Sequence, residues 1–172
     1  HEKYIRSGAQ LSSQINSIQN ILLLQVNGIG DVFQSTPVIK NMKTRLPNAK
    51  IDVLITASAI GMIENNPYVN RIFTLPLQPP KEEIKEIVKV LKPFKYDLII
   101  NLASRNSTEK LVTSLTSKWK INMNHFYREK LTDVMIGFTK NDSSFIQKEF
   151  DLLQKIGFEP KKYMPEIFFK SE

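Results

Sequence analysis

LLLQVNGIGDVFQSTPVIKNM, residues 22–42, passes without interruption from an apolar run into two glycines, an acid and a Thr-Pro step. The apolar run starts at Ile21 and predicts a buried strand that extends to Val26. From Val38 to Leu46, apolar residues recur at helical spacing, so a helix is expected after the glycines. A strand that leads through a short turn into a helix is the building unit of a parallel α/β sheet.

The same alternation continues along the rest of the chain. The expected strands are IDVLIT (51–56), RIFTLPL (71–77), YDLIINLA (96–103) and WKINMN (119–124), with EIFF (166–169) as a last strand or a linker. The expected helices are 57–66, a stretch from Lys81 that Pro93 ends, 107–117 with Ser107 or Thr108 as its cap, and 143–158. The runs at 21–26 and 96–103 are the most apolar, so both should be central strands. The sequence therefore predicts an α/β fold, a Rossmann-like open parallel sheet with helices on both faces.

Composition limits the possible partners and cofactors. The 172 residues, 41% of them hydrophobic, correspond to one ordinary domain. The chain has no cysteine, and His1 and His125 lie far apart in sequence, so neither a disulfide nor a metal site is expected. The net charge of +7 favours acidic partners such as phosphorylated sugars or an anionic membrane surface. Basic residues do not alternate with aromatic ones as in RNA-binding proteins, so nucleic acid is not an expected partner.

The loop after the first strand is the place where open parallel sheets bind their ligands. It does not match a dinucleotide-binding fingerprint, because Phe33 occupies the third glycine position and Thr56, not an acid, closes the second strand. No Gly-Lys-Ser or Gly-Lys-Thr follows, which excludes a phosphate-binding P-loop. Gly28 and Gly30 are instead expected to give backbone torsions that other residues disfavour, and to clear the space above Asp31.

Asp31 itself has two interpretations. It is either a helix cap, the commonest role of an acid at a helix start, or a carboxylate presented to a ligand at the mouth of the sheet. Thr36 and Pro37 likewise have two interpretations. They form either the cap and first residue of a helix, or a kink within a helix that begins earlier, at Asp31.

Several of these motifs occur together in one known family. Gly30-Asp31, Thr36-Pro37, LPNAKIDVL (46–54), NPYV (66–69) and YDLIINL (96–102) follow one another in the order and at the spacing of glycosyltransferase family 9. EFDLLQKIGFEP (149–160) continues the likeness more weakly. From about residue 20 onward the chain therefore resembles the start of the ADP-heptose lipopolysaccharide heptosyltransferases.

The resemblance implies a two-domain GT-B enzyme, in which an N-terminal Rossmann-like half receives the acceptor and a C-terminal half binds the nucleotide sugar. It implies an N-terminal extension at 1–20, an acceptor-binding domain at 21–165, and a linker from 166 to 172 toward a donor-binding domain. Asp31 matches the family's catalytic base in an inverting reaction without a metal. After the fourth strand, where many members carry a Gln-Gly pair, this chain has Ala103-Ser104-Arg105. The acceptor-binding residues expected from this comparison are Asn27, Gly28, Gly30, Ser104 and Arg105.

The resemblance also implies the partners and the location. They are a lipid-linked phosphorylated glycan as acceptor, ADP-heptose as donor without any further cofactor, and peripheral contact with the cytoplasmic face of a Gram-negative inner membrane. The apolar residues in MPEIFFKSE (164–172) are expected to lead into the second domain. The alternative, which needs only the sheet and the positive charge, is a non-catalytic Rossmann-like module that binds a nucleotide or an acidic partner.

Overall fold

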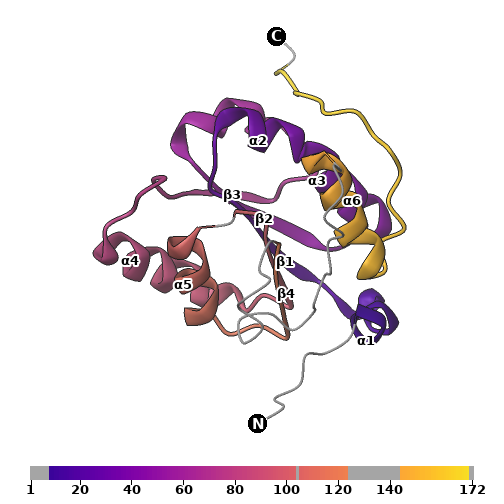
Figure 1. Ribbon diagram of the computed structural model, residues 1–172, viewed down its shortest axis with the longest axis horizontal. Coiled ribbons are helices and arrows are strands. Elements are labelled where there is room, and N and C mark those ends of the chain that lie inside the picture. Colours follow the sequence, from indigo (N-terminus) through magenta and orange to yellow (C-terminus); the bar gives the residue numbers. More distant parts are fainter. Residues whose placement is uncertain (1–7, 104, 124–143, 171–172) are drawn as a thin grey trace.

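The computed structural model describes residues 8–103, 105–123 and 144–170, which form a five-stranded sheet surrounded by helices (Figure 1). The strands are β1 (Asn20–Gln25), β2 (Lys50–Ile55), β3 (Arg71–Thr74), β4 (Leu98–Asn101) and β5 (Trp119–Asn122). Their order is β3-β2-β1-β4-β5, and every neighbouring pair is parallel. This confirms the predicted fold class and the central positions of the strands at 21–26 and 96–103.

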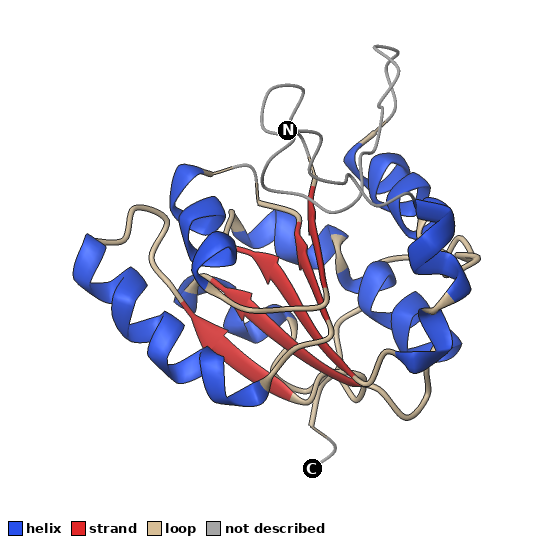
Figure 2. Cartoon of the chain, turned by 90° about the horizontal axis from the view of Figure 1, so that it is seen from below, coloured by secondary structure: helices blue, strands red, loops and turns tan. Residues whose placement is uncertain are grey.

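Helices cover both faces of this sheet (Figure 2). The α-helices are α1 (Gly8–Ser13), α2 (Ile29–Gln34), α3 (Thr36–Arg45), α4 (Lys81–Leu91), α5 (Asn106–Ser114) and α6 (Phe145–Lys155). The 3-10 helices are η1 (Ile15–Ser17), η2 (Ala57–Met62) and η3 (Lys92–Phe94). One hydrophobic cluster joins the sheet to α1, α3 and α6, and a second joins the opposite face to α4 and α5.

Alternation along β1 assigns its residues to these two faces. Leu22 and Leu24 belong to the cluster with α4 and α5, whereas Ile21 and Leu23 belong to the cluster with α3 and α6. Gln25, the last residue of the strand, continues the second series and is buried on the α6 side. A polar side chain therefore enters the core at the carboxyl end of the central strand.

The region around Pro37 contains two short helices rather than one kinked helix. α2 starts after Gly28 and ends at Gln34, and α3 begins at Thr36 with Pro37 in its first turn. Ser35, not Thr36 as expected, is the N-cap residue of α3, and its amide donates to Asp31 O at 3.1 Å. Proline is tolerated at this position because the backbone amides of the first helical turn have no acceptor within the helix.

The cap predicted for α5 is also wrong. The helix starts at Asn106, and its N-cap residue is Arg105, which makes no capping hydrogen bond through its side chain. Thr108 is fully buried and donates to Ala103 O at 2.9 Å, so it fastens the helix to the end of β4. The EIFF segment at 166–169 forms no strand.

α1 packs against α6 and contributes the buried Leu11 to the core, and η1 contributes the buried Ile15. Gly157, just after α6, has a φ of +96°, in the left-handed region that favours glycine. A Cβ on Gly157 would lie 2.5 Å from Ser12 Oγ and 2.9 Å from Ser12 Cα. Because Cα is backbone, rotating the serine side chain cannot relieve that overlap.

Gly157→Ala is therefore expected to lower the free energy of unfolding by at least about 2 kcal/mol, through left-handed backbone strain and overpacking. Urea unfolding followed by circular dichroism would measure the change. The matched control is Gly61→Ala, because a Cβ on Gly61 would meet no described atom within 4 Å. The control should stay within about 0.5 kcal/mol of the parent, and equal losses at both positions would contradict the proposed contact.

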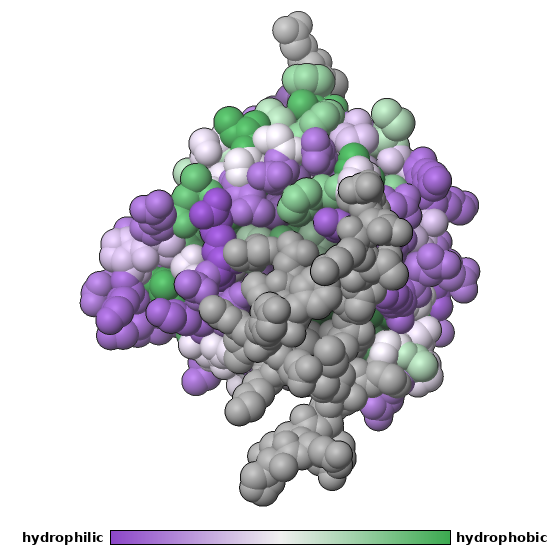
Figure 3. Space-filling model, viewed as in Figure 1, coloured by the Kyte–Doolittle hydropathy of each residue, from purple (hydrophilic) through white to green (hydrophobic). Residues whose placement is uncertain are grey.

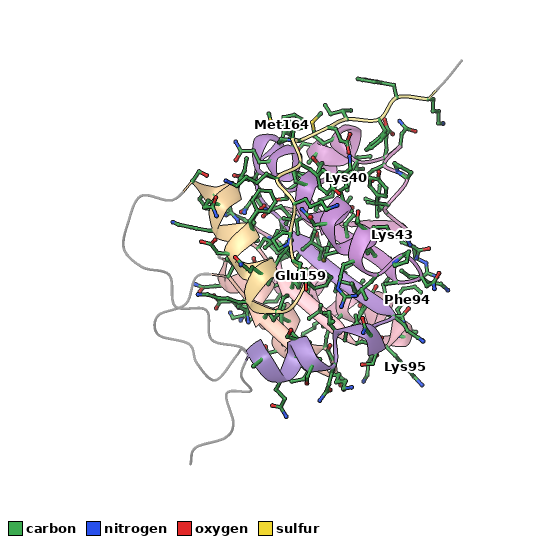
Figure 4. All side chains as sticks on the ribbon, turned by 90° about the vertical axis from the view of Figure 1, so that its right-hand side faces the viewer. Lys40, Lys43, Phe94, Lys95, Glu159 and Met164 are labelled. Atoms are coloured by element: carbon green, nitrogen blue, oxygen red, sulfur yellow. The ribbon has the colours of Figure 1, made fainter. Side chains whose placement is uncertain are left out.

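After α6 the chain runs in an extended path alongside α3, as the segment from Glu159 past Met164 shows in Figure 4. Asn41 donates from Nδ2 to Lys161 O at 2.9 Å and accepts from Lys161 N at 2.7 Å. Further along, Lys40 Nζ lies 2.8 Å from Glu166 Oε1. These contacts hold residues 158–170 against α3.

Large hydrophobic side chains are exposed in and near this segment. Met164 is 80% exposed, Phe169 is 84% exposed, and Ile29 at the start of α2 is 46% exposed. Figure 3 shows hydrophobic surface toward the top of the view, where α2 and the C-terminal segment lie, and a hydrophilic surface over α4. The domain boundaries, and a second domain after residue 166, stay predictions.

Candidate functional site

The site predicted from the sequence lies at the carboxyl edge of the sheet, between β1 and β4. These two strands are neighbours, although β2 and β3 lie between them in the chain, so the strand order changes direction here. In open parallel sheets the loops that follow such a pair of strands diverge and leave a crevice for a ligand. The loop after β1 carries Asn27 and Gly28 and leads into α2 with Asp31, and the loop after β4 carries Ala103 and Arg105.

Asp31 is the third residue of α2 and is partly buried. Its Oδ2 accepts a hydrogen bond from Gly28 N at 3.0 Å, which satisfies one of the free amides at the helix start. Among the described residues, no donor reaches Oδ1 of Asp31. The carboxylate is thus held by one oxygen while the other can accept a proton or a hydrogen bond from a ligand, so the capping and the reactive interpretations are compatible.

The two glycines do not have the torsions that the sequence led us to expect. Gly28 has a φ of −65° and a ψ of 165°, and Gly30 is not among the residues with a positive φ. A Cβ on Gly30 would meet nothing within 4 Å in the described part of the chain. Neither backbone strain nor packing therefore explains glycine at position 30, and the open space expected above Asp31 stays a prediction.

Asn27 and Arg105, both predicted to bind the acceptor, are joined in the structure. Arg105 Nε donates to Asn27 Oδ1 at 3.0 Å, across the gap between the β1 and β4 loops. Thr56, at the end of β2, donates from Oγ1 to Asn27 O at 3.1 Å. Arg105 is partly buried, and no described residue accepts from its Nη1 or Nη2, so these nitrogens can bind an anionic group in two-point fashion. Ser104, the remaining predicted residue, lies outside the described residues.

A buried polar cluster beneath the loop was not found by sequence reasoning. Glu149 of α6 is only 2% exposed, and its Oε1 accepts from Ser35 Oγ at 2.8 Å and from Gln25 Nε2 at 3.4 Å. Gln25 Nε2 also donates to Ser35 Oγ at 2.7 Å, and Gln25 Oε1 accepts from Asn27 Nδ2 at 2.8 Å. Oε2 of Glu149 has no hydrogen-bond partner among the described residues.

Burial raises the pKa of the Glu149 carboxyl to about 7, because few polar groups compensate for the lost water. The hydrogen bond from Ser35 acts in the opposite direction, and the negative charge of Asp31 raises the pKa further. Glu149 therefore changes charge near neutral pH. The signal in the sequence was an acid at a core position, since Leu152, Leu153 and Ile156 follow it at helical spacing and are all buried.

Asp52, an acid of the second strand, belongs to a different region near the amino end of β2. It is buried, and Tyr96 Oη donates to its Oδ2 at 2.8 Å while Asn70 Nδ2 donates to its Oδ1 at 2.7 Å. Burial and the hydrogen bond to Asp52 raise the pKa of the Tyr96 hydroxyl. The cluster fastens β2 to Tyr96, which precedes β4, and lies apart from the candidate site at the carboxyl edge.

Two further features are absent from the described residues: a metal-binding group of side chains and a membrane-spanning helix. No group of three or more His, Cys, Asp or Glu side chains in this part of the chain lies close enough together to hold a metal ion. None of its helices has the length and apolar character that crossing a membrane requires.

Comparison with known proteins gave related sequences. No family model matches the chain. It is 34% identical over 105 residues to lipopolysaccharide heptosyltransferase 3 of Escherichia coli, which covers 58% of this chain and 31% of that protein. It is 21% identical over 104 residues to a putative glycosyltransferase of Haemophilus influenzae, covering 60% of this chain and 30% of that protein. The chain thus spans about a third of the length of the curated relatives it matches.

Solved structures share the fold. The glycosyltransferase family 9 protein of Veillonella parvula superposes with a TM-score of 0.73 at 17% identity, over 81% of this chain and 41% of that one. E. coli heptosyltransferase WaaC with ADP superposes with a TM-score of 0.72 at 16% identity, over 86% of this chain and 51% of that one. The chain therefore resembles the heptosyltransferases in sequence and has the fold of glycosyltransferase family 9, as its motifs predicted.

Proposed function

We propose that this chain is the N-terminal, acceptor-binding half of an inverting glycosyltransferase that transfers heptose from ADP-heptose to a lipopolysaccharide core or a related glycan. The observation that carries the proposal is the Asp31 carboxylate at the crevice, anchored through Oδ2 with Oδ1 available. The sequence similarity to heptosyltransferases supplies the class of reaction.

In this reaction Asp31 acts as general base. An acceptor hydroxyl donates its proton to Oδ1, and its oxygen forms a bond to the anomeric carbon of the heptose. The bond from that carbon to the diphosphate breaks on the opposite face, so ADP leaves with the electron pair and the anomeric configuration inverts. A positioned base of this kind is worth about 10²- to 10⁴-fold in rate. The open space at Gly30 gives the acceptor hydroxyl access to the carboxylate.

Arg105 is suited to the acceptor, because a guanidinium binds phosphate or carboxylate oxygens through two parallel hydrogen bonds. Asn27 holds Arg105 through Nε and leaves the outer nitrogens for the ligand. We assign the phosphorylated part of the acceptor to Arg105, and the donor mainly to a second domain that follows residue 166. The net charge of +7 would favour peripheral contact of the protein with an anionic inner-membrane surface.

The test is a transfer assay with the full-length protein, ADP-heptose and a truncated lipopolysaccharide core. Mass spectrometry should show acceptor that has gained one heptose, and the anomeric proton signal of the product should show inversion. Excess EDTA should leave the rate unchanged, since no step uses a metal. Absence of transfer to every core acceptor, with retained binding of a nucleotide or an acidic ligand, would favour the non-catalytic module instead.

A further inference from the structure

The polar side chains between the crevice and the core form one continuous series of hydrogen bonds. Arg105 Nε donates to Asn27 Oδ1 at 3.0 Å, and Asn27 Nδ2 donates to Gln25 Oε1 at 2.8 Å. Gln25 Nε2 then donates to Ser35 Oγ at 2.7 Å, and Ser35 Oγ donates to Glu149 Oε1 at 2.8 Å. Every bond donates in the same direction, from the guanidinium toward the buried carboxyl group.

Because the guanidinium at one end can only donate and Glu149 Oε1 at the other end accepts, the two ends together determine the orientation of the amides between them. Glu149 Oε1 accepts from Ser35 Oγ and also, at 3.4 Å, from Gln25 Nε2, so the Gln25 amide nitrogen faces Glu149 and the Gln25 carbonyl faces Asn27. The Asn27 carbonyl then points to Arg105. If either amide turned over, two donors or two acceptors would meet in a partly or fully buried place, which is unfavourable.

We propose that Glu149 is a positioning residue for the acceptor site: through Ser35, Gln25 and Asn27 it fixes the Arg105 guanidinium in the orientation that binds the acceptor. The anionic acceptor as ligand rests on the proposed function, whereas the coupling of Glu149 to Arg105 does not. The Glu149 atom that has this role is Oε1, the oxygen that accepts the hydrogen bond from Ser35. Ser35 has one alternative acceptor, Asp31 O at 2.9 Å, to which its hydroxyl turns when Glu149 is lost.

The first experiment measures the coupling without using activity. In the full-length protein labelled with ¹⁵N-arginine, hydrogen exchange at the Arg105 Nε–H reports its bond to Asn27. Glu149→Leu, which removes the acceptor and keeps side-chain volume, should speed this exchange by at least about tenfold, because the bond to Asn27 opens more often. Ser35→Ala is a second variant that alters the side chain less and removes the next residue of the series. It should also speed the exchange, and it serves as the test if Glu149→Leu does not fold.

Two matched variants make the result specific. Glu149→Gln keeps an amide oxygen for Ser35 and should restore exchange to within about twofold of the parent. Asp151→Asn alters a carboxylate on the same helix that accepts from Gln147 Nε2, outside the series, and should change nothing. Unchanged exchange at Arg105 in both Glu149→Leu and Ser35→Ala would overturn the inference.

The second experiment concerns the acceptor. Glu149→Leu should raise the KM for the phosphorylated core acceptor by about tenfold, with a smaller effect on kcat and on the KM for ADP-heptose, because a positioned charged hydrogen bond is lost. Glu149→Gln should restore the acceptor KM. Faster exchange with an unchanged acceptor KM would overturn the positioning role, whereas faster exchange in a protein without any transferase activity would remove the proposed function and leave the coupling intact.

Discussion

Asp31→Asn should lower the turnover of the full-length enzyme by at least about a hundredfold, while the free energy of unfolding stays within about 1 kcal/mol of the parent. Asparagine can accept the hydrogen bond from Gly28 N as the carboxylate does, so the start of α2 is preserved. It cannot take a proton from an acceptor hydroxyl, so under the proposed mechanism the chemical step loses its base. Steady-state kinetics and thermal unfolding of the same preparation would measure both quantities.

The acceptor KM separates this result from a binding defect. It should change little, because Asp31 acts on the hydroxyl in the transition state while Arg105 carries the proposed ground-state contact. Asp151→Asn makes the same chemical change away from the crevice and should leave turnover unaltered. Loss of stability with retained turnover would show instead that Asp31 is only a helix cap.

Glu149→Gln is expected to change how the stability of the protein depends on pH. The pKa of Glu149 is about 7 in the folded protein, against 4.5 as the ordinary value. Between these two values the folded state therefore holds a proton that the unfolded state has released, so the free energy of unfolding falls as pH rises. The parent should lose about 3 kcal/mol relative to the glutamine variant between pH 4.5 and pH 8, with little further change above pH 8.

Urea unfolding at a series of pH values, for parent and variant in parallel, would give this difference directly. Asp31 is the charged group that acts on Glu149, so Asp31→Asn in the parent background should lower the pKa of Glu149 and shrink the effect. The control is Glu64→Gln, which makes the same chemical change at an exposed position, and its comparison with the parent over the same pH series gives the effect of the substitution itself. A parent-to-variant difference that is constant with pH would mean that Glu149 titrates near its ordinary value.

The sequence was sufficient to predict the fold because its signals are local and repeated. Each strand is a short apolar run, and Val38, Ile39 and Met42 mark the buried side of α3 as their spacing predicted. The helix expected at 143–158 forms as α6, Phe145–Lys155, and the side chain of its N-cap residue Ser144 accepts from Gln147 N. Asn27 and Arg105 were expected at one site from the resemblance alone, and the structure joins them by a hydrogen bond.

The parts that sequence reasoning missed depend on contacts between distant residues. Ser35 and Glu149 are 114 positions apart, so no local pattern could pair them. The torsions of Gly28 and Gly30 were misjudged because glycine in a loop is compatible with many backbone conformations, and only coordinates distinguish them. An acid on the apolar side of a helix was the visible clue to Glu149, but its partner could not be named.

The burial of Gln25 at the last position of β1 has a consequence for how related sequences can diverge. Strand alternation makes residue 25 point toward α6. An apolar residue at position 25 would therefore leave Glu149 with fewer hydrogen-bond donors. An apolar residue at position 149 would leave Gln25 without its carboxylate acceptor. A change at one position is tolerated only with a matching change at the other. Positions 25, 35 and 149 should therefore covary among homologues, either polar together or apolar together, even where Asp31 is retained.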